Sequence, residues 1–103
     1  MDIATYQNGE GQVVEVRGEL TNAEDPERVV TAVERVLATA APPLVKVNVR
    51  HVPIVDLEGI AALVKARKAV LGSGARFRLI DGQPRVRNRL AVTGLLHLLE
   101  DGA

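Results

Sequence analysis

Residues 44–74 read LVKVNVRHVPIVDLEGIAALVKARKAVLGSG, and the alternation of apolar and polar positions in this stretch decides the fold. Its first part, Leu44 to Val49, is a valine-rich run with only two polar interruptions, and it predicts a strand. Asp56 then precedes a helical pattern, and a Gly-Ser-Gly turn ends that pattern. The predicted helix is traced by Ile60, Leu63, Val64, Arg67 and Leu71, with Lys65, Arg67 and Lys68 at its flank. The stretch therefore predicts a strand, a loop and a helix in that order.

The residues before this stretch predict a hairpin and a first helix. Two short runs, Ile3 to Gln7 and Gln12 to Arg17, flank an Asn-Gly-Glu-Gly turn and indicate two paired strands. Apolar residues then recur at helical spacing from Val29 to Ala40. Asn22 or Asp25 is expected to cap this helix, because both side chains accept hydrogen bonds from free helical amides.

The residues after it predict one more strand and two short helical segments. Arg76 to Ile80 alternates between charged and apolar residues, Pro84 to Val92 has helical spacing, and Leu95 to Leu99 is expected to form a turn or short helix. The element order is β-β-α-β-α-β-α-α. We therefore predict a single α/β domain over residues 1–103, with a mixed sheet of about four strands covered by about four helices.

The composition excludes several classes of function. With one Tyr, one Phe and no Trp, the chain has too few aromatics for base-stacking platforms or aromatic cages. Its 13 basic and 13 acidic side chains cancel, which removes the overall positive charge typical of dedicated nucleic-acid binders. The chain has no cysteine, so thiolate-ligated metal centres are excluded. We expect no cofactor and no direct contact with nucleic acid.

Catalytic and targeting signals are also weak. His51 and His97 have no second ligand at helical spacing, so no metal site is predicted. Ser73 lies in a turn without the pattern of an activated nucleophile. The first residues form no leader peptide, and no stretch approaches the roughly 18 apolar residues of a membrane span. We therefore expect a cytoplasmic protein without membrane insertion.

The densest basic feature is a group of five arginines in the last third of the chain. Arg85 and Arg89 share one face of the predicted helix, whereas Arg87 points elsewhere. Arg76 and Arg78 lie on the preceding strand. We favour a solvated surface over a binding site for an anionic partner, because no single stripe forms.

The loop before the central helix carries the most informative residues. Asp56 is positioned to cap the helix, and Glu58 adds negative charge at the favourable end of the helix dipole. Leu57 lies between them, outside the predicted apolar face that starts at Ile60. It is either an exposed apolar contact residue or a residue packed beneath the neighbouring loop, and the sequence leaves both open.

Several short motifs, in this order and spacing, resemble the STAS domain, the family named for sulphate transporters and anti-sigma factor antagonists. The Gly-Glu-Leu strand end, the central strand with its loop, the Gly-x-x-x-Leu helix start and the C-terminal Thr-Gly-Leu all have counterparts here. They lie at Val16 to Leu20, Val47 to Asp56, Gly59 to Leu63, and Leu79 to Leu95. The resemblance covers nearly the whole chain.

The resemblance implies a non-enzymatic binding switch. In the antagonist branch, the domain docks on an anti-sigma factor with a histidine-kinase-like ATPase fold, and that kinase phosphorylates the serine after the loop aspartate. Here the family's Asp-Ser-Ser-Gly or Asp-Ser-Thr-Gly is Asp56-Leu57-Glu58-Gly59. Leu57 has no hydroxyl group, so phosphorylation at this position is chemically excluded. The charge of Glu58 is one residue away and mimics a phosphate poorly.

The resemblance therefore predicts a partner-binding loop over Asp56, Leu57, Glu58 and Gly59. Thr21, where the family commonly has aspartate, and Asn22 are expected as flanking contacts. The predicted partner is an anti-sigma factor of the kinase-like type. Two alternatives stay open: a STAS scaffold or accessory subunit of a lipid-transport ABC system or stressosome-like complex, and an enzyme or small-ligand binder outside these systems. The oligomeric state is not predicted.

Overall fold

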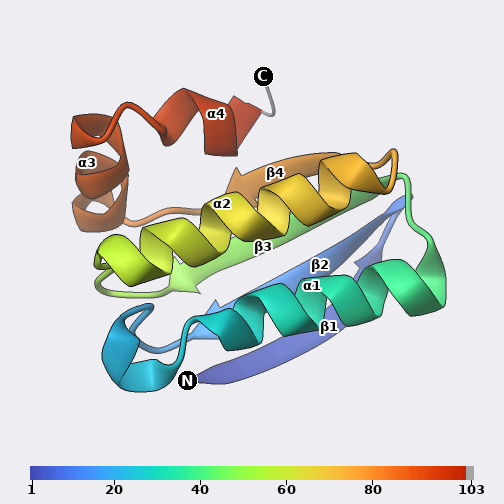
Figure 1. Ribbon diagram of the computed structural model, residues 1–103, viewed down its shortest axis with the longest axis horizontal. Helices are drawn as coiled ribbons and strands as arrows, with labels where there is room; N and C mark the ends of the chain where they lie inside the picture. The colour runs from blue at the N-terminus through green and yellow to red at the C-terminus, as the bar shows by residue number, and fades with distance from the viewer. Residues whose placement is uncertain (102–103) are drawn as a thin grey trace.

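Four strands form the sheet at the centre of the protein, and the second and third of them are rich in valine (Figure 1). The computed structural model describes residues 1–101, so residues 102 and 103 of the predicted domain lie outside the described residues. The strands are β1 (Asp2–Asn8), β2 (Gly11–Arg17), β3 (Leu44–His51) and β4 (Arg76–Ile80), and they lie in the order β1-β2-β3-β4. β1 runs antiparallel to β2, whereas β2, β3 and β4 are parallel. The predicted mixed sheet is confirmed.

The turn between β1 and β2 follows from a glycine. Asn8 lies opposite Gly11, so only two residues form the loop. Gly9, the first of them, has a φ of 62°. Two-residue hairpin turns require a positive φ at this position, which glycine adopts without a steric penalty.

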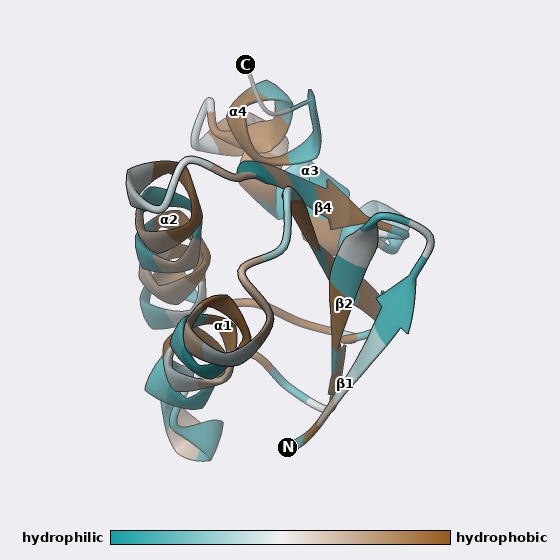
Figure 2. Cartoon of the chain, turned by 90° about the vertical axis from the view of Figure 1, so that its right-hand side faces the viewer, coloured by the Kyte–Doolittle hydropathy of each residue, from teal (hydrophilic) through white to brown (hydrophobic). Residues whose placement is uncertain are grey.

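The helices are α1 (Glu27–Ala40), α2 (Leu57–Gly72), α3 (Pro84–Val92) and α4 (Leu96–Asp101). α1 and α2 lie side by side on one face of the sheet, and α4 lies against β4 (Figures 1 and 2). The predicted element order is confirmed, and the last apolar run is a helix rather than a turn. A short 3₁₀ helix, Asn22–Glu24, precedes α1. Within residues 1–101, no helix has the length and apolar character that crossing a membrane requires.

The core consists of aliphatic side chains on the helix-facing side of the sheet. The register aligns Val14 of β2, Val47 of β3 and Leu79 of β4 in one row. All three are at most 3% exposed. Phe77 is also buried and lies opposite Val45. Because β-branched residues pack well on a pleated surface, this sequence forms a tight sheet core with a single aromatic ring.

The predicted side-chain cap of α1 is wrong. Pro26 occupies the N-cap position, and no side chain caps the helix there. The Arg28 and Val29 amides instead donate to the backbone carbonyls of Asp25 and Pro26, at 3.1 and 3.0 Å. Asp25 has a left-handed φ of 52°, and the turn that it forms places these carbonyls at the N-terminal end of the helix. Backbone acceptors thus replace the expected role of Asn22 or Asp25.

The buried face of α2 also differs from the predicted one. Leu71 is 41% exposed, whereas Ala62, Ala66 and Val70 are buried with Leu63. Small alanine side chains on this face let α2 lie close to α1 and to the sheet. The sequence pattern was ambiguous because apolar residues occur on both sides of this helix.

Candidate functional site

Two loops that are far apart in the sequence meet at one end of the molecule, beside the start of α2 (Figure 1). One follows β2 and the other follows β3. The Leu20 amide donates to the Ile54 carbonyl at 3.0 Å, and the Asp56 amide donates to the Leu20 carbonyl at 3.3 Å. Leu20 and Val55 form an isolated parallel bridge. The pairing of β2 with β3 is thereby continued into the loops, and it sets the position of Asp56.

Asp56 connects the two loops through its carboxylate. Its Oδ1 accepts a hydrogen bond from the Gly59 amide at 2.9 Å, which caps α2, and its Oδ2 accepts one from the Asn22 amide at 3.0 Å. These two bonds lower the pKa of Asp56 from its ordinary value because they favour the ionised form, and the bond from the Asn22 amide has the larger effect. The predicted cap of α2 is confirmed, and the same side chain anchors the loop that contains Asn22.

Gly59 allows the two loops to approach this closely. It is buried, and a Cβ atom built on it would lie 1.9 Å from the Leu20 carbonyl oxygen and 2.8 Å from Cγ2 of Val55. Contacts this short do not occur between such atoms. The motif glycine is therefore required by packing against Leu20 rather than by an unusual φ.

Leu57 is the first residue of α2, and its side chain is 68% exposed. The structure thus decides between the two alternatives left open by the sequence: Leu57 is a surface residue. Glu58 beside it is also exposed, whereas Gly59 and Ile60 turn into the core. An exposed leucine held on a rigid, capped helix start presents apolar surface in a defined position.

A shallow groove of about 350 Å³ lies on one side of this loop, between Ile54, Asp56 and helix α3. Arg85, Asn88, Arg89 and Val92 of α3 also line it. Val92 is 86% exposed, and the structure records no ion pair for either arginine among residues 1–101.

The sequence prediction did not include this groove. Arg85, Arg89 and Val92 have helical i, i+4, i+7 spacing, so one face of α3 carries two cations and an exposed valine. That face was a signal in the sequence, but only the fold shows that it lies beside Asp56. The arginines are exposed, as expected of a solvated face, yet they are concentrated next to the predicted loop.

A second groove on the other side of the loop is acidic. Asn22, Asp25, Glu27 and Glu58 line it together with Pro26 and Ala61. Glu27 pairs with Lys65 of α2. The loop that carries Leu57 therefore lies between a basic groove and an acidic one. Charge separation across an apolar contact residue favours one orientation of a bound protein.

The predicted flanking residues differ in accessibility. Asn22 is exposed, and its amide is the group bound by Asp56. Thr21 is only 8% exposed, and its Oγ1 donates to Oε1 of Glu19 at 3.5 Å. The fold thus brings Asn22 to the surface of the candidate site, whereas Thr21 lies mostly beneath it.

The described residues form no metal centre. Across residues 1–101, no three His, Asp or Glu side chains gather closely enough to hold a metal ion. His51 is exposed, and His97 Nδ1 lies 3.0 Å from Oδ2 of Asp101 on α4. Asp101 follows His97 by four residues, so the expectation that neither histidine has a carboxylate at helical spacing is wrong for His97. The arrangement around Leu57 is an apolar contact between charged grooves, which suits recognition of a protein surface.

Comparisons with known proteins bear on the family and on the fold. A family model described as the STAS domain matches residues 2–101. SpoIIAA, an anti-sigma factor antagonist solved in its unphosphorylated form, has a TM-score of 0.77 at 17% identity, over 95% of this chain and 85% of that one. An anti-sigma factor antagonist from Mycobacterium paratuberculosis has a TM-score of 0.79 at 20% identity, over 95% and 81%.

A protein of a transporter family is similar as well. A sulfate transporter family protein from Wolinella succinogenes has a TM-score of 0.72 at 20% identity, over 91% of this chain and 75% of that one. No curated protein sequence matches the chain significantly. At these identities the solved structures show a shared fold.

Proposed function

Because this chain belongs to the STAS domain family, we propose that it is a non-enzymatic regulator that acts by binding another protein, as an anti-sigma factor antagonist. Its partner is an anti-sigma factor with a histidine-kinase-like ATPase fold. The anti-sigma factor antagonists among the similar structures support this branch of the family. A protein that controls a sigma factor acts in the cytoplasm, where transcription takes place.

The exposure of Leu57 is the observation that carries the proposal. Single exposed aliphatic side chains are common on protein surfaces, but Leu57, at 68% exposure, lies on a capped helix start between a basic groove and an acidic one. Bound to a partner, the same side chain can fill an apolar pocket at the centre of an interface. Asp56 and Glu58 flank it in the chain, and the bonds of the Asp56 carboxylate to the Gly59 and Asn22 amides fix the helix start on which it lies.

We further propose that phosphorylation of the loop does not control binding. SpoIIAA has been solved in a phosphorylated and an unphosphorylated form. In this chain the residue after Asp56 is Leu57, which offers no oxygen to a kinase. Binding is then set by the amounts of the partners or by a change in the partner itself.

Leu57→Asp tests the docking surface, by which we mean the surface formed by Leu57 with Asn22, Asp56 and Glu58. We expect a roughly thirtyfold loss of affinity for the anti-sigma factor, because a charge replaces an apolar anchor residue. The thermal midpoint should stay nearly unchanged because the side chain is exposed. Titration calorimetry and circular dichroism measure the two quantities.

Leu71→Asp is the matched control, since Leu71 is also an exposed leucine of α2 but lies at the other end of the helix. It should leave the affinity unchanged. Equal affinity of Leu57→Asp and the parent protein would contradict the proposed surface.

The double variant Leu57→Ser, Glu58→Ser tests the kind of partner. It restores the serine that the family's kinases phosphorylate, so a kinase-type anti-sigma factor supplied with radiolabelled ATP should label the variant and not the parent. Binding without labelling of the variant would argue against a kinase partner. Capture of an ABC-type ATPase instead of an anti-sigma factor would favour the alternative role as a transport subunit.

A further inference from the structure

Strand β1 has an unprotected open edge. Within residues 1–101 it pairs with β2 alone, so alternate residues turn their backbone N–H and C=O groups away from the sheet. The strand is seven residues long, and every residue except Ile3 is exposed. Edge strands are usually protected by lysine, proline or a bulge, but β1 contains no lysine and no proline, and its only charged residue is Asp2 at its start. Such an edge can accept another strand.

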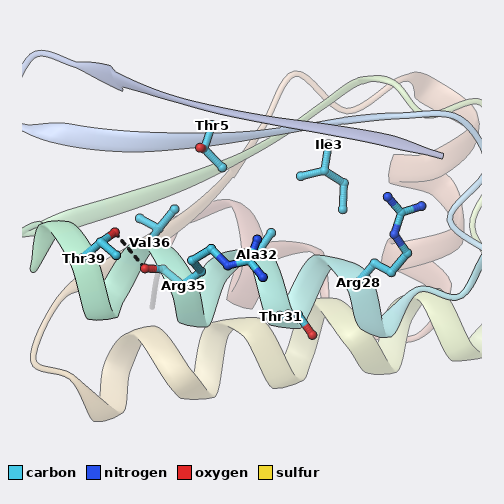
Figure 3. A pocket seen from close by; sticks show the side chains of 8 residues that line it. All are labelled: Ile3, Thr5, Arg28, Thr31, Ala32, Arg35, Val36 and Thr39. Atoms are coloured by element: carbon cyan, nitrogen blue, oxygen red, sulfur yellow. Dashed lines mark hydrogen bonds between the residues drawn. The ribbon is translucent and has the colours of Figure 1, made fainter.

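A groove of about 460 Å³ lies beside this edge, between β1 and α1 (Figure 3). Ile3 and Thr5 extend from β1 toward α1, and Ala32 and Val36 form the apolar part of the helix side. A strand added to β1 would lie about 4.8 Å from it. Half of its side chains would project on the same side of the sheet as Ile3 and Thr5, and thus over the groove.

The charge of the groove indicates what those side chains are. Its charged lining residues are Arg28 and Arg35, and no acidic residue lines it. Arg28 Nη1 donates to the Met1 carbonyl at 2.8 Å. The Arg35 guanidinium is exposed and makes no hydrogen bond or ion pair with any of residues 1–101. Carboxylates above the groove would pair with these two cations.

We propose that the open edge of β1 and the groove beside it bind an extended acidic segment of a partner protein by β-strand addition. The backbone groups of β1 supply the hydrogen bonds. Arg28 and Arg35 select two carboxylates that are four positions apart on one face of the segment, and Ile3, Ala32 and Val36 accept the apolar side chain between them. The site is independent of the docking surface around Leu57, since no residue lines both.

A second copy of this chain fits the groove less well. Joined edge to edge with its helices on the same side, its own β1 would present Ile3, Thr5 and Gln7 over the groove. None of these carries a charge, so both arginines would be left without carboxylates. Charge complementarity thus favours an acidic partner segment over self-association.

Two synthetic peptides test the proposal on the full chain. In acetyl-Thr-Glu-Thr-Val-Thr-Glu-Thr-amide, two glutamates and a valine share one face of an extended strand; in the second peptide, lysines replace the glutamates. We expect the glutamate peptide to shift the amide resonances of β1 and the guanidinium resonances of Arg35, and to slow hydrogen exchange along β1. The lysine peptide should bind roughly tenfold more weakly or worse.

Arg35→Glu provides the charge reversal. This exposed residue is not part of the core, so the fold is expected to be retained. The preference for the glutamate peptide should be lost, because the groove then carries one cation, Arg28, and one anion. Arg89→Glu, on the groove beside Asp56, is the matched control and should leave the peptide preference unchanged.

Three results would overturn the proposal. The first is the absence of shifts and protection in β1, and the second is an unchanged preference in Arg35→Glu. The third is slowed hydrogen exchange in β1 without peptide that increases with protein concentration, together with a dimer in sedimentation experiments. That result would show that a second copy occupies the edge.

Discussion

Gly59→Ala is expected to lower the free energy of unfolding by about 3 kcal/mol or more, although it adds a single methyl group. The new Cβ would lie 1.9 Å from the Leu20 carbonyl oxygen, which is roughly half of an ordinary contact distance. Neither side can yield easily. The Leu20 carbonyl accepts the Asp56 amide, and Gly59 lies in the first turn of a helix that packs against α1. The start of α2 must therefore move away from the loop after β2.

Thermal and denaturant unfolding measure this effect, and for a domain of this size the expected loss corresponds to roughly 15 °C in Tm. Gly72→Ala is the matched control, because Gly72 is also a residue of α2 and a Cβ there meets nothing within 4 Å. That change should be neutral or stabilise by up to about 1 kcal/mol. Similar Tm values for both variants would show that the loops separate at little cost.

The second large effect is expected from Asp56→Ala, with a loss of about 2 kcal/mol at neutral pH. The substitution removes the cap of α2 and leaves the Asn22 amide without its carboxylate acceptor. Its influence extends across both loops because one carboxylate holds them together. Hydrogen exchange should therefore accelerate in residues 21–24 as well as in the first turn of α2.

The pH dependence of the Asp56 contribution follows from its lowered pKa. A carboxyl group whose pKa is lower in the folded state stabilises the protein at pH values above its unfolded pKa of about 3.9. The contribution disappears as the pH falls through the lower folded value. The stability difference between the parent and Asp56→Ala should thus be constant at neutral pH and shrink below about pH 4.

Other groups with lowered pKa values, Glu24 and Glu100, are present in both proteins and cancel in that difference. Asp56→Asn separates the charge from the cap, since asparagine also caps helices well. Asp56→Asn should lose less stability than Asp56→Ala, and residue 56 of this variant should contribute no pH dependence to the free energy of unfolding. A stability difference between the parent and Asp56→Ala that grows toward acidic pH would contradict the assigned role of the carboxylate.

The element order was predictable because local periodicity reports local structure. Each of the signals that predict this order depends on residues that are close together in the sequence. They are the valine runs of β2 and β3, the helical spacing in α1 and the Asp56 cap. The cap of α1 was not predictable in the same way. Its acceptors are backbone carbonyls positioned by the left-handed conformation of Asp25, and no pattern of side chains predicts that conformation.

The sequence by itself determined the order of strands and helices, and it determined that residue 57 cannot accept a phosphate, because leucine has no hydroxyl group. Only the tertiary structure decided that Leu57 is exposed, that Gly59 faces the Leu20 carbonyl, and that Arg89 and Val92 lie beside Asp56. The physical reason is separation along the chain. Asn22 and Asp56 are 34 residues apart, and their hydrogen bond exists only after the sheet has brought both loops to the same end of the molecule.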